Sequence, residues 1–482
     1  MSDALKTLGE LKVDDLGSYW AVCNALDAES KLLARDEDHR RFLGQQPTPL
    51  WQRLDLAWKT FTERVTKAEH LESGDIQTLL TLARFTRNLV AGVAENQVEA
   101  FNFEPYIRSA IRYLTSWTML QREEVTSNPE LSSSLWQSYM RDAEDSNLFL
   151  RILVVEDIKG LIAGFVLLLN VTNGSRDSLR LLVETKAGRR VADKLLTRMA
   201  ILLEAPEGSE EAQACDIGYQ FIKQVFEHGL AVDLYEHIAQ EGEPVMANQR
   251  ILLKLFDGYL QSPTMETSIE AYYARDIPKL YLIIAYKSLK SIKTSLETAE
   301  SPDGHLPVLS EALVLVAQCC QALLLREATS THRPILQQMR IKRIQGQGTV
   351  EVTIDVLREL NVLLPRIEFG KSVPSPFTKG MNHPPEETDP MEFPYLKRDL
   401  IRLLGTMVYK DKGMQDRVRA CGGVEVVMSH CVIDDRNPYL REHAIFTLRH
   451  LLEDNLENQR VVKELKPLRD FDAEGILRDV VP

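Results

Sequence analysis

Between Phe393 and Leu465 the chain reads FPYLKRDLIRLLGTMVYKDKGMQDRVRACGGVEVVMSHCVIDDRNPYLREHAIFTLRHLLEDNLENQRVVKEL. Apolar residues recur in it at helical spacing, and Leu400, Leu404 and Met407 illustrate one such face. A spacing of i, i+3, i+4 and i+7 predicts helices that are buried on one side. Short amphipathic helices joined by polar connectors favour a stacked helical surface over a catalytic pocket.

Two dipeptides in this stretch predict helix boundaries. Asn437-Pro438 predicts a helix start, because Asn accepts hydrogen bonds from free amides and Pro at the first helical position loses none. Gly422-Gly423 predicts a helix end and a tight turn into the next helix, because glycine adopts positive φ without steric cost.

The chain also repeats itself. RNLVAGVAENQ at Arg87–Gln97 shares its Arg, its Leu and its Glu-Asn-Gln with RHLLEDNLENQ at Arg449–Gln459. Gln415 and Gln459 lie 44 residues apart, within the period of about 40–47 residues of HEAT and armadillo repeats. The sequence therefore predicts an all-α, armadillo/HEAT-like helical-repeat superhelix, an α-solenoid that stacks neighbours to cover each repeat's apolar face.

The connector Asp434–Asn437 (DDRN) and the preceding Tyr395–Asp399 (YLKRD) resemble the C-terminal domain of the ataxin-10 family, with a fungal homolog expected. The resemblance covers roughly Phe393–Leu465. It implies an armadillo-like, non-enzymatic cytoplasmic scaffold that makes protein–protein contacts and regulates cytokinesis. The partners expected from it are cell-division kinases or signalling proteins, and a homo-oligomer is a further expectation.

Proline divides the chain into three predicted regions. Seven prolines fall between positions 365 and 394, and each removes a backbone donor and disfavours helix at the residue before it. We therefore expect an N-terminal array at 1–364, a Pro-rich linker at 365–392 and the C-terminal domain at 393–482. Ser375-Pro376 in the linker is a candidate phosphorylation site, and the basic stretch His332–Gly348 is expected to be a surface loop.

Composition narrows the function classes. The net charge of −13 argues against a nucleic-acid partner, which requires a basic surface. The longest uninterrupted apolar run, around Leu161–Leu169, is far shorter than the roughly 20 residues of a membrane span. The N-terminal residues lack the order of a signal peptide, and the six cysteines are scattered. We expect a cytoplasmic protein with no membrane span and no cofactor.

Candidate partner-binding residues come from the repeated helix ends. In armadillo arrays the third helix of each repeat lines a groove, where asparagine can hold the backbone of an extended peptide. Asn88 and Asn170, with Arg87, are candidates for this role, and His450 occupies the matching position near the C-terminus. The alternative, which the sequence favours, is that these asparagines form hydrogen bonds within the turn between repeats.

Two arginines of the C-terminal stretch complete the candidate set. Arg402 and Arg449 can pair with carboxylates such as Asp399 or Glu453 of neighbouring helices. Exposed ion pairs contribute only about 0–1 kcal/mol. These arginines would therefore determine packing details or form a partner surface.

Two other functions stay open. Fungal members of the resembling family carry a copper-transport name, and Cu(I) requires soft ligands close together. The residues concerned are Cys421, Met428, His430, Cys431 and His443. The apolar pattern places Met428 and Cys431 in the core, so an adaptor in copper homeostasis or trafficking is an alternative without direct metal binding. An enzyme with an unrecognised site is the other alternative, although the sequence contains no Gly-x-Ser-x-Gly and no His-Glu-x-x-His.

Overall fold

The computed structural model describes residues 16–45, 50–67, 73–113, 136–137, 140, 147–172, 175–262, 270–297, 303–330, 332–368, 371–372, 393, 395–465, 469–471 and 477–479. Within these residues the regular structure is almost entirely α-helical, and the strands are short arms of antiparallel hairpins. The all-α prediction is therefore confirmed. The chain divides into two compact units, Met1–Ile238 and Ala239–Pro482.

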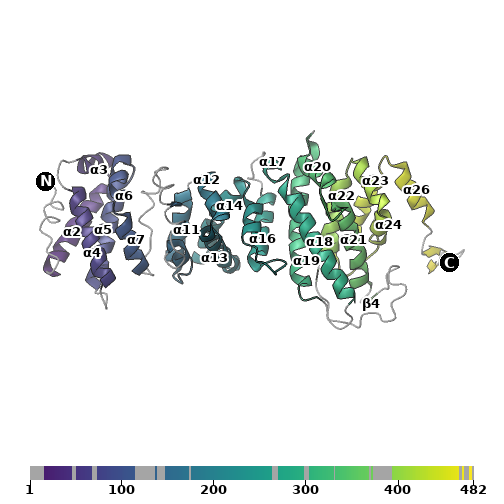
Figure 1. Ribbon diagram of the computed structural model, residues 1–482, viewed down its shortest axis with the longest axis horizontal. Helices are drawn as coiled ribbons and strands as arrows, with labels where there is room; N and C mark the ends of the chain where they lie inside the picture. Colours follow the sequence, from purple (N-terminus) through teal and green to yellow (C-terminus); the bar gives the residue numbers. More distant parts are fainter. Residues whose placement is uncertain are drawn as a thin grey trace. The chain divides into compact units, whose positions relative to one another are not determined.

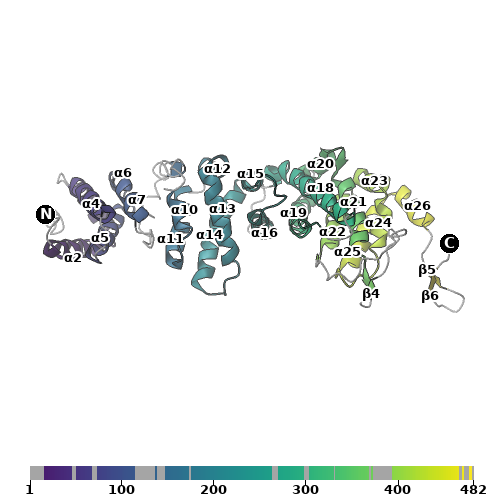
Figure 2. The ribbon, with the colours of Figure 1, turned by 60° about the horizontal axis from the view of Figure 1, so that its bottom comes forward.

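In the first unit, helices pack against the helix that stands at the same place in the next repeat. Thus α2 packs on α5, α4 on α7 and α11 on α14 (Figure 1), and α10 packs on α13 (Figure 2). Buried Trp58, Phe61 and Phe85 fill the core between α4 and α5. The helices of this unit are α2 (Leu16–Leu33), α3 (Glu37–Gly44), α4 (Leu50–Lys67), α5 (Ser73–Val90), α6 (Ala94–Phe101), α7 (Glu104–Tyr113), α10 (Leu148–Ile152), α11 (Ile158–Thr172), α12 (Arg176–Glu184), α13 (Lys186–Leu202), α14 (Glu210–Glu227) and α15 (Ala231–His237).

The second unit stacks its helices in three rows. Figure 2 shows α20, α23 and α26 in one row, α18, α21 and α24 in the next, and α19, α22 and α25 in the third. The helices of this unit are α16 (Ala247–Gln261), α17 (Glu270–Tyr273), α18 (Asp276–Glu297), α19 (Leu306–Arg326), the 3-10 helix η2 (Glu327–Thr329), α20 (Pro334–Ile341), α21 (Thr349–Leu363), α22 (Leu396–Val408), α23 (Lys412–Ala420), α24 (Gly423–Ser429), α25 (Leu440–Leu452) and α26 (Leu456–Glu464). The strands are β1 (Arg343–Ile344) with β2 (Gln347–Gly348), β3 (Ile367–Glu368) with β4 (Lys371–Ser372), and β5 (Arg469–Phe471) with β6 (Leu477–Asp479).

Three helices make one repeat: a short first helix, a second helix and a third helix that packs on the third helix of the neighbouring repeat. The third helices α16, α19, α22 and α25 pack in succession. Leu396 and Leu440, which begin α22 and α25, lie 44 residues apart, as the glutamine spacing predicted. The starts of α16 and α19, Ala247 and Leu306, lie 59 residues apart, because the second helix between them, α18, has 22 residues against 7 in α24. The armadillo-like helical repeat is thus confirmed, with a period that varies along the chain.

The Glu-Asn-Gln that follows α5 and α25, and Gln415 after α22, close the ends of these three third helices. Carbonyl groups in the last turn of a helix have no partner within it and need an outside donor. Here a side-chain amide of the following short helix donates to a carbonyl seven residues earlier. These bonds run from Asn96 Nδ2 to Leu89 O (2.9 Å), Gln97 Nε2 to Val90 O (3.3 Å), Gln415 Nε2 to Val408 O (3.4 Å), Asn458 Nδ2 to Leu451 O (2.7 Å) and Gln459 Nε2 to Leu452 O (2.8 Å).

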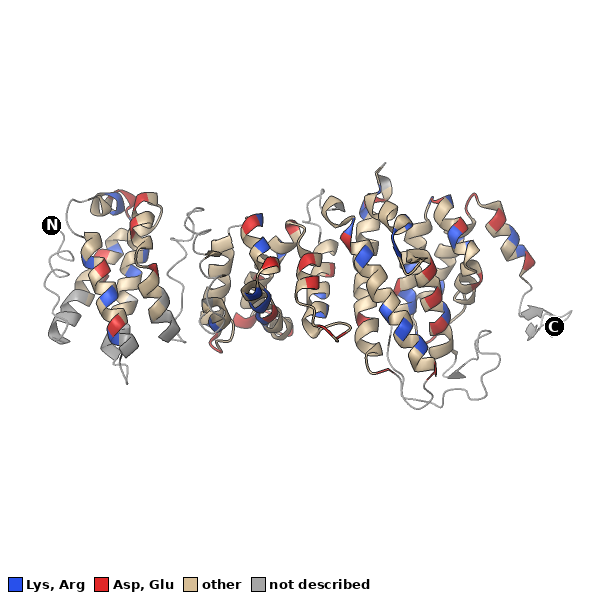
Figure 3. Cartoon of the chain, viewed as in Figure 1, with Lys and Arg blue, Asp and Glu red and all other residues tan. Residues whose placement is uncertain are grey.

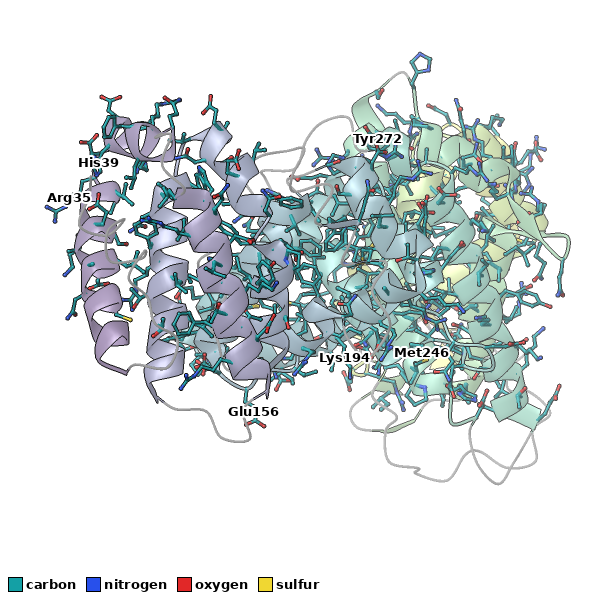
Figure 4. The ribbon with its side chains drawn as sticks, turned by 60° about the vertical axis from the view of Figure 1, so that its left-hand side comes forward. Arg35, His39, Glu156, Lys194, Met246 and Tyr272 are labelled. Carbon is teal, nitrogen blue, oxygen red and sulfur yellow. The ribbon has the colours of Figure 1, made fainter. Side chains whose placement is uncertain are left out.

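The turn before each of these short helices contains one residue in the left-handed backbone conformation. Gly92, Lys410 and Asp454 adopt left-handed φ values of 70°, 52° and 55°. Asp411 and Asn455 then cap the short helices through their side chains. The joint between α2 and α3 is built alike, since Arg40 Nη1 donates to a carbonyl seven residues earlier, 2.9 Å away. Figure 4 labels Arg35 and His39 at that joint.

Asn458→Ala is expected to lower the free energy of unfolding by about 2–3 kcal/mol, because it leaves buried groups without partners. Asn458 is fully buried, donates to Leu451 O and accepts from Arg419 Nη1 at 2.8 Å. Urea unfolding measures the loss. The control Gln459→Ala removes one bond from a half-buried side chain and should cost about 1 kcal/mol. Equal losses in the two variants would contradict the assigned role of Asn458.

Two local predictions about the C-terminal stretch have different outcomes. Gly422 adopts φ +69° between α23 and α24, so the predicted glycine turn is confirmed. The predicted helix start at Asn437-Pro438 is wrong: α25 begins at Leu440, after a turn closed by the Leu440 amide and the Asn437 carbonyl at 3.1 Å. The Asn437 side chain donates to Asp434 Oδ2 at 2.8 Å instead of capping the helix.

The basic stretch His332–Gly348 is not a loop, so that expectation is wrong. It holds α20 and the hairpin β1–β2, because Ile335, Leu336 and Met339 form an apolar stripe that is buried.

The first residues of the expected linker at 365–392 are bound to the C-terminal domain. Ile367 donates its amide to Asp434 Oδ1 at 3.1 Å, and its carbonyl accepts from the Asp435 amide at 2.8 Å. Residues 373–392 lie outside the described residues. The unit that includes the C-terminal domain begins at Ala239, well before the expected boundary at 393.

Of the helices that the structure describes, α19 is long and apolar enough by itself to cross a membrane, and the bent pair α11 and α12 passes that test together. The expectation of no membrane span rested on uninterrupted apolar runs and overlooked α19. This helix packs against α16, α18 and α22, and 61% of its most apolar window is buried inside the fold. Its place in the core accounts for its composition.

Candidate protein-binding face

The exposed sides of α16, α19, α22 and α25 form one continuous surface of the second unit, here named the third-helix face. Acidic and basic residues are both spread over the helices of each unit (Figure 3). At the start of the face, Glu311 of α19 pairs with Arg250 and, at 2.8 Å, with Lys254 of α16. Ion pairs between neighbouring third helices therefore tie this end of the surface together.

Asp399 is the centre of the polar network on α22. Its side chain is 1% exposed and accepts hydrogen bonds from Arg398 Nε at 2.9 Å, Arg402 Nη1 at 3.3 Å and Gln318 Nε2 of α19 at 2.8 Å. Burial raises the pKa of Asp257 on α16, and Asp399 adds to that shift. The carboxylate of Asp399 thus holds two guanidinium groups in place along the face.

The sequence predicted that Arg402 pairs with a carboxylate such as Asp399 on a neighbouring helix. Asp399 is the partner, but the pair forms within one helix. Arg398 and Arg402 both use Asp399, but they do so within α22 instead of between helices. Arg449 is exposed on α25. Arg402 and Arg449 lie on adjacent third helices, and their role in partner binding stays a prediction.

Close backbone contact joins α22 to α25. A Cβ atom at Gly405 would lie 2.5 Å from Thr447 Oγ1, so only glycine fits without displacement. Thr447 Oγ1 donates to Ile401 O at 3.0 Å, and His450 Nδ1 lies 3.2 Å from Gly405 O. His450 is thereby placed at the joint between the two helices, where its ring also lies 4.9 Å from that of Tyr409.

The two arginines of α22 affect the pKa of a histidine on α25. Burial, followed by Arg402 and Arg398, lowers the pKa of His443 on α25. His443 therefore stays neutral near pH 7, and it adds no positive charge to the two arginines.

Two tyrosines enter the third helices in a strained conformation. Tyr395 (φ 81°, ψ −13°) precedes α22, and Tyr439 (φ 65°, ψ 4°) precedes α25. A positive φ in a bulky residue is a rare outlier. Both side chains are nonetheless exposed, by 41% and 69%. The Arg398 guanidinium lies 4.1 Å from the centre of the Tyr395 ring, in cation–π contact.

Apolar side chains are exposed beside these groups on α25. Phe446 is 59% exposed and Ile445 is 47% exposed. The 44-residue repeat places Phe446 at the position that Arg402 holds on α22. Exposed apolar groups that border charged groups are typical of protein-binding surfaces.

A buried polar cluster lies at the start of α22. Lys397 is 2% exposed and donates to the carbonyl oxygen of Leu364, the residue that directly follows α21, at 2.6 Å. Burial lowers the pKa of Lys397 to about 8. Asp434, 8% exposed, binds the Ile367 amide, so the YLKRD and DDRN segments both bind the chain that follows α21. These two segments thus have a structural role.

His430 belongs to the same cluster. It ends α24, its Nδ1 lies 2.7 Å from Val426 O, and its Nε2 is buried without a hydrogen-bond partner among the described residues. Burial and then the charge of Lys397 lower the pKa of His430 to about 4.

The candidate residues of the first unit are placed as follows. Asn88 is 9% exposed, and its Nδ2 donates to Ser30 O at 2.9 Å and Ser30 Oγ at 2.8 Å. Arg87 Nε donates to Asn88 Oδ1 at 3.2 Å. Asn170 is half-buried in α11, and its Nδ2 is buried without a partner in the described part of the chain. Asn88 thus joins α5 to α2, which is an internal contact but not the expected hydrogen bond within the turn between repeats, and peptide binding by these residues stays a prediction.

Ser375 lies outside the described residues, so its phosphorylation stays a prediction. Among the residues that the structure describes, no group of three or more His, Cys, Asp or Glu is arranged to hold a metal ion. Cys421 and Cys431 are free and half-buried.

Sequence reasoning missed the tyrosines, although a signal for them is present. Pro394-Tyr395-Leu396-Lys397 and Pro438-Tyr439-Leu440-Arg441 repeat a Pro-Tyr-Leu-basic pattern 44 residues apart. Gln318 carries no such signal, because its role depends on a contact with a residue 81 positions later.

The C-terminal segment of the chain is similar to known proteins. Residues 396–480 match the family model described as the spinocerebellar ataxia type 10 protein domain. The chain is 42% identical over 97 residues to an Ataxin-10 homolog of Dictyostelium discoideum, covering 20% of this chain and 15% of that protein. It is 39% identical over 74 residues to the Ataxin-10 homolog of Saccharomyces cerevisiae (15% and 13%) and 39% identical over 70 residues to human Ataxin-10 (14% and 15%). Each match thus spans at most 15% of the relative's length.

Two solved structures resemble the chain only distantly. One is an engineered protein, with 12% identity, a TM-score of 0.32 and coverage of 94% of this chain and 99% of that one. The other comes from work on a phosphorylation switch between cadherin and beta-catenin, with 12% identity, a TM-score of 0.34 and coverage of 94% and 75%. The helical-repeat assignment therefore rests on the helices of this chain itself.

Proposed function

We propose, on the premise that residues 396–480 are an ataxin-10 domain, that this protein is a non-enzymatic scaffold that binds partner proteins through its third-helix face. The observation that carries the proposal is the combination of half-buried Arg402 with exposed Phe446 and Arg449 on two stacked third helices. A broad surface of repeated helices suits a protein partner better than a small molecule, which requires a concave pocket.

The cellular role is proposed from the resemblance to the ataxin-10 family. We place the protein in the cytoplasm, as a regulator of cytokinesis whose partners include cell-division kinases or signalling proteins. The network around Asp399 supports a fixed binding surface, because it orients Arg398 and Arg402 before any partner arrives. An adaptor role in copper homeostasis or trafficking is the second candidate and would use the same surface.

Pull-down from synchronised dividing cells tests the proposal. The full chain should recover proteins of the division machinery, and the double variant Phe446→Glu/Arg449→Glu should lose most of them. Both side chains are exposed, so the substitutions should leave the fold intact, which circular dichroism checks. The matched control is Leu456→Glu/Arg460→Glu, an exposed Leu–Arg pair on α26.

Equal recovery by the chain and its Phe446/Arg449 variant would refute binding at the third-helix face. Recovery that depends on this face but contains copper-handling or trafficking proteins, without division proteins, would select the second candidate.

A further inference from the structure

We infer that Arg340, Lys342, Arg343 and Arg417, here named the arginine cluster, bind a phosphorylated Ser, Thr or Tyr side chain of a partner protein. The cluster is formed by α20, strand β1 and α23, and α20 and α23 belong to a different row of helices from the third-helix face (Figure 2). It therefore adds a second site to the proposed scaffold and uses the basic stretch His332–Gly348, to which the proposed function gives no role.

Two guanidinium groups of the cluster meet at Gly348. A Cβ atom at this glycine would lie 2.6 Å from Arg343 Nη1 and 2.5 Å from Arg417 Nη2. Both arginines also donate to one carbonyl oxygen, that of Arg340, over 2.7 Å and 2.9 Å. Residues up to 77 positions apart in the sequence thus bring their positive charge to one place.

The carboxylates of the cluster do not balance this charge. Asp411, whose side chain is 2% exposed, pairs with Arg340, and Glu351 pairs with Arg417 at 2.5 Å. Glu351 also attracts Arg343, but among the described residues Arg343 donates to main-chain carbonyls and forms no ion pair. The cluster therefore has four cations and two carboxylates, although the whole chain carries a net charge of −13.

The carboxylates next to the cluster have arginine partners of their own. Asp355 pairs with Arg358 at 2.6 Å, and Asp416 pairs with Arg419 at 2.7 Å. Farther along the same row, α26 contains as many acidic as basic residues. The positive excess is thus confined to one repeat, which suits a single phosphate group better than the long backbone of a nucleic acid.

The hairpin β1–β2 holds Arg343 in place. Its turn residues Gln345 and Gly346 have φ values of 49° and 82°, as in the tight two-residue turns of β-hairpins. The Gln345 side chain accepts a hydrogen bond from the Tyr286 hydroxyl of α18, and Gln347 Nε2 donates to Asp355 Oδ2 of α21 at 2.8 Å. The hairpin is therefore fixed before a ligand binds, which reduces the entropic cost of binding.

A phosphate group matches these donors better than a carboxylate does. Guanidinium binds either group with two parallel hydrogen bonds. A phosphorylated side chain carries a charge of about −1.5 to −2 and three acceptor oxygens, so it can bind two guanidinium groups at once. Ile341, which is 65% exposed between Arg340 and Lys342, offers an apolar contact to the residues that flank the phosphate. The cluster thus fits a phosphorylated protein segment.

Fluorescence anisotropy of labelled peptide pools, titrated with the full chain, tests the inference. The short peptides of each pool have random flanks and a fixed phosphoserine, phosphothreonine or phosphotyrosine at the centre. At least one pool should bind tenfold or more tightly than the matched pool without phosphate. It should also bind tenfold more tightly than a pool with Glu at the centre, because a carboxylate has less charge and fewer acceptors.

Two variants locate the binding site. Arg343→Gln removes the cation that has no carboxylate partner, and Gly348→Ala keeps the charge but introduces a Cβ atom where the two guanidinium groups meet. Each variant should weaken phosphopeptide binding at least fivefold. The matched control Arg460→Gln removes an exposed arginine of α26 and should stay within twofold of the native chain. Circular dichroism checks that each variant is folded.

Phosphorylated pools that bind no more tightly than the Glu pool, or that bind Arg343→Gln as tightly as the native chain, would overturn the inference. Binding of anionic phospholipid vesicles without binding of any phosphopeptide would also overturn it and would assign the cluster to a membrane. Phe446→Glu/Arg449→Glu changes only the third-helix face, so this variant should bind the peptides normally. Its recovery of cellular partners tests the scaffold proposal separately.

Discussion

Asp399→Ala is expected to lower the free energy of unfolding by about 3 kcal/mol, because removing one member of a buried ion pair leaves its partners uncompensated. Asp399 is 1% exposed and is the common partner of Arg398, Arg402 and Gln318. The value lies at the low end for buried pairs, since Arg398 and Arg402 remain 17% and 32% exposed and retain some hydration. Chemical unfolding of the full chain measures it.

Two variants control this experiment. Asp399→Asn keeps the size and one acceptor for Gln318, so its loss should be smaller. Glu457→Ala removes the partner of Arg460 in an exposed pair and should cost less than about 1 kcal/mol. If Asp399→Ala costs no more than Glu457→Ala, the carboxylate does not organise the face.

Lowering the pH from 6.5 to 4 is expected to reduce the free energy of unfolding by about 3 kcal/mol, because buried His430 resists protonation. The pKa of this buried imidazole is about 4 in the folded chain, against an unperturbed value near 6.5. The unfolded chain therefore takes up the proton first as pH falls. The contribution of neutral His430 to the free energy of unfolding is therefore fully present above pH 6.5 and is lost progressively between pH 6.5 and 4. Lys397, with a pKa of about 8, is charged throughout this window and adds no slope.

His430→Gln tests this assignment. Glutamine can keep a hydrogen bond to Val426 O but does not titrate, so the variant should lose less stability between pH 6.5 and 4 than the native chain does. Unfolding free energies measured at pH 7, 5.5 and 4.5 supply the comparison. A native chain and variant with the same pH dependence would show that another group causes the acid loss.

The fold class was predictable because its signals are local. Apolar spacing, the glycines at 422–423 and the repeated Glu-Asn-Gln each report on contacts within one helix or one turn. The repeat to which Asn458 and Gln459 belong was recognisable in the sequence for this reason, since each side chain donates to a carbonyl only seven residues earlier.

The errors arose where another contact overrides the preference read from a short motif. Asn437 carries the right chemistry for a helix cap, yet Asp434, three residues earlier, accepts a hydrogen bond from its side chain and the helix begins three residues later. Residues 332–348 read as a polar loop, but the fold covers their three apolar side chains. The candidate site was predicted only in part: Arg402, Arg449 and His450 were named, whereas Gln318 depends on packing between α19 and α22.

The burial of α19 has a consequence for biosynthesis. This apolar helix ends at Arg326, whereas α22, which packs against it, is complete only at Val408. A ribosome must add some eighty further residues before that cover exists, and during this interval the side of α19 that faces α22 stays uncovered, on a helix with the length and composition of a membrane anchor. Premature stop codons between these points would leave this side without its cover, a state suited to capture by chaperones or to mistargeting.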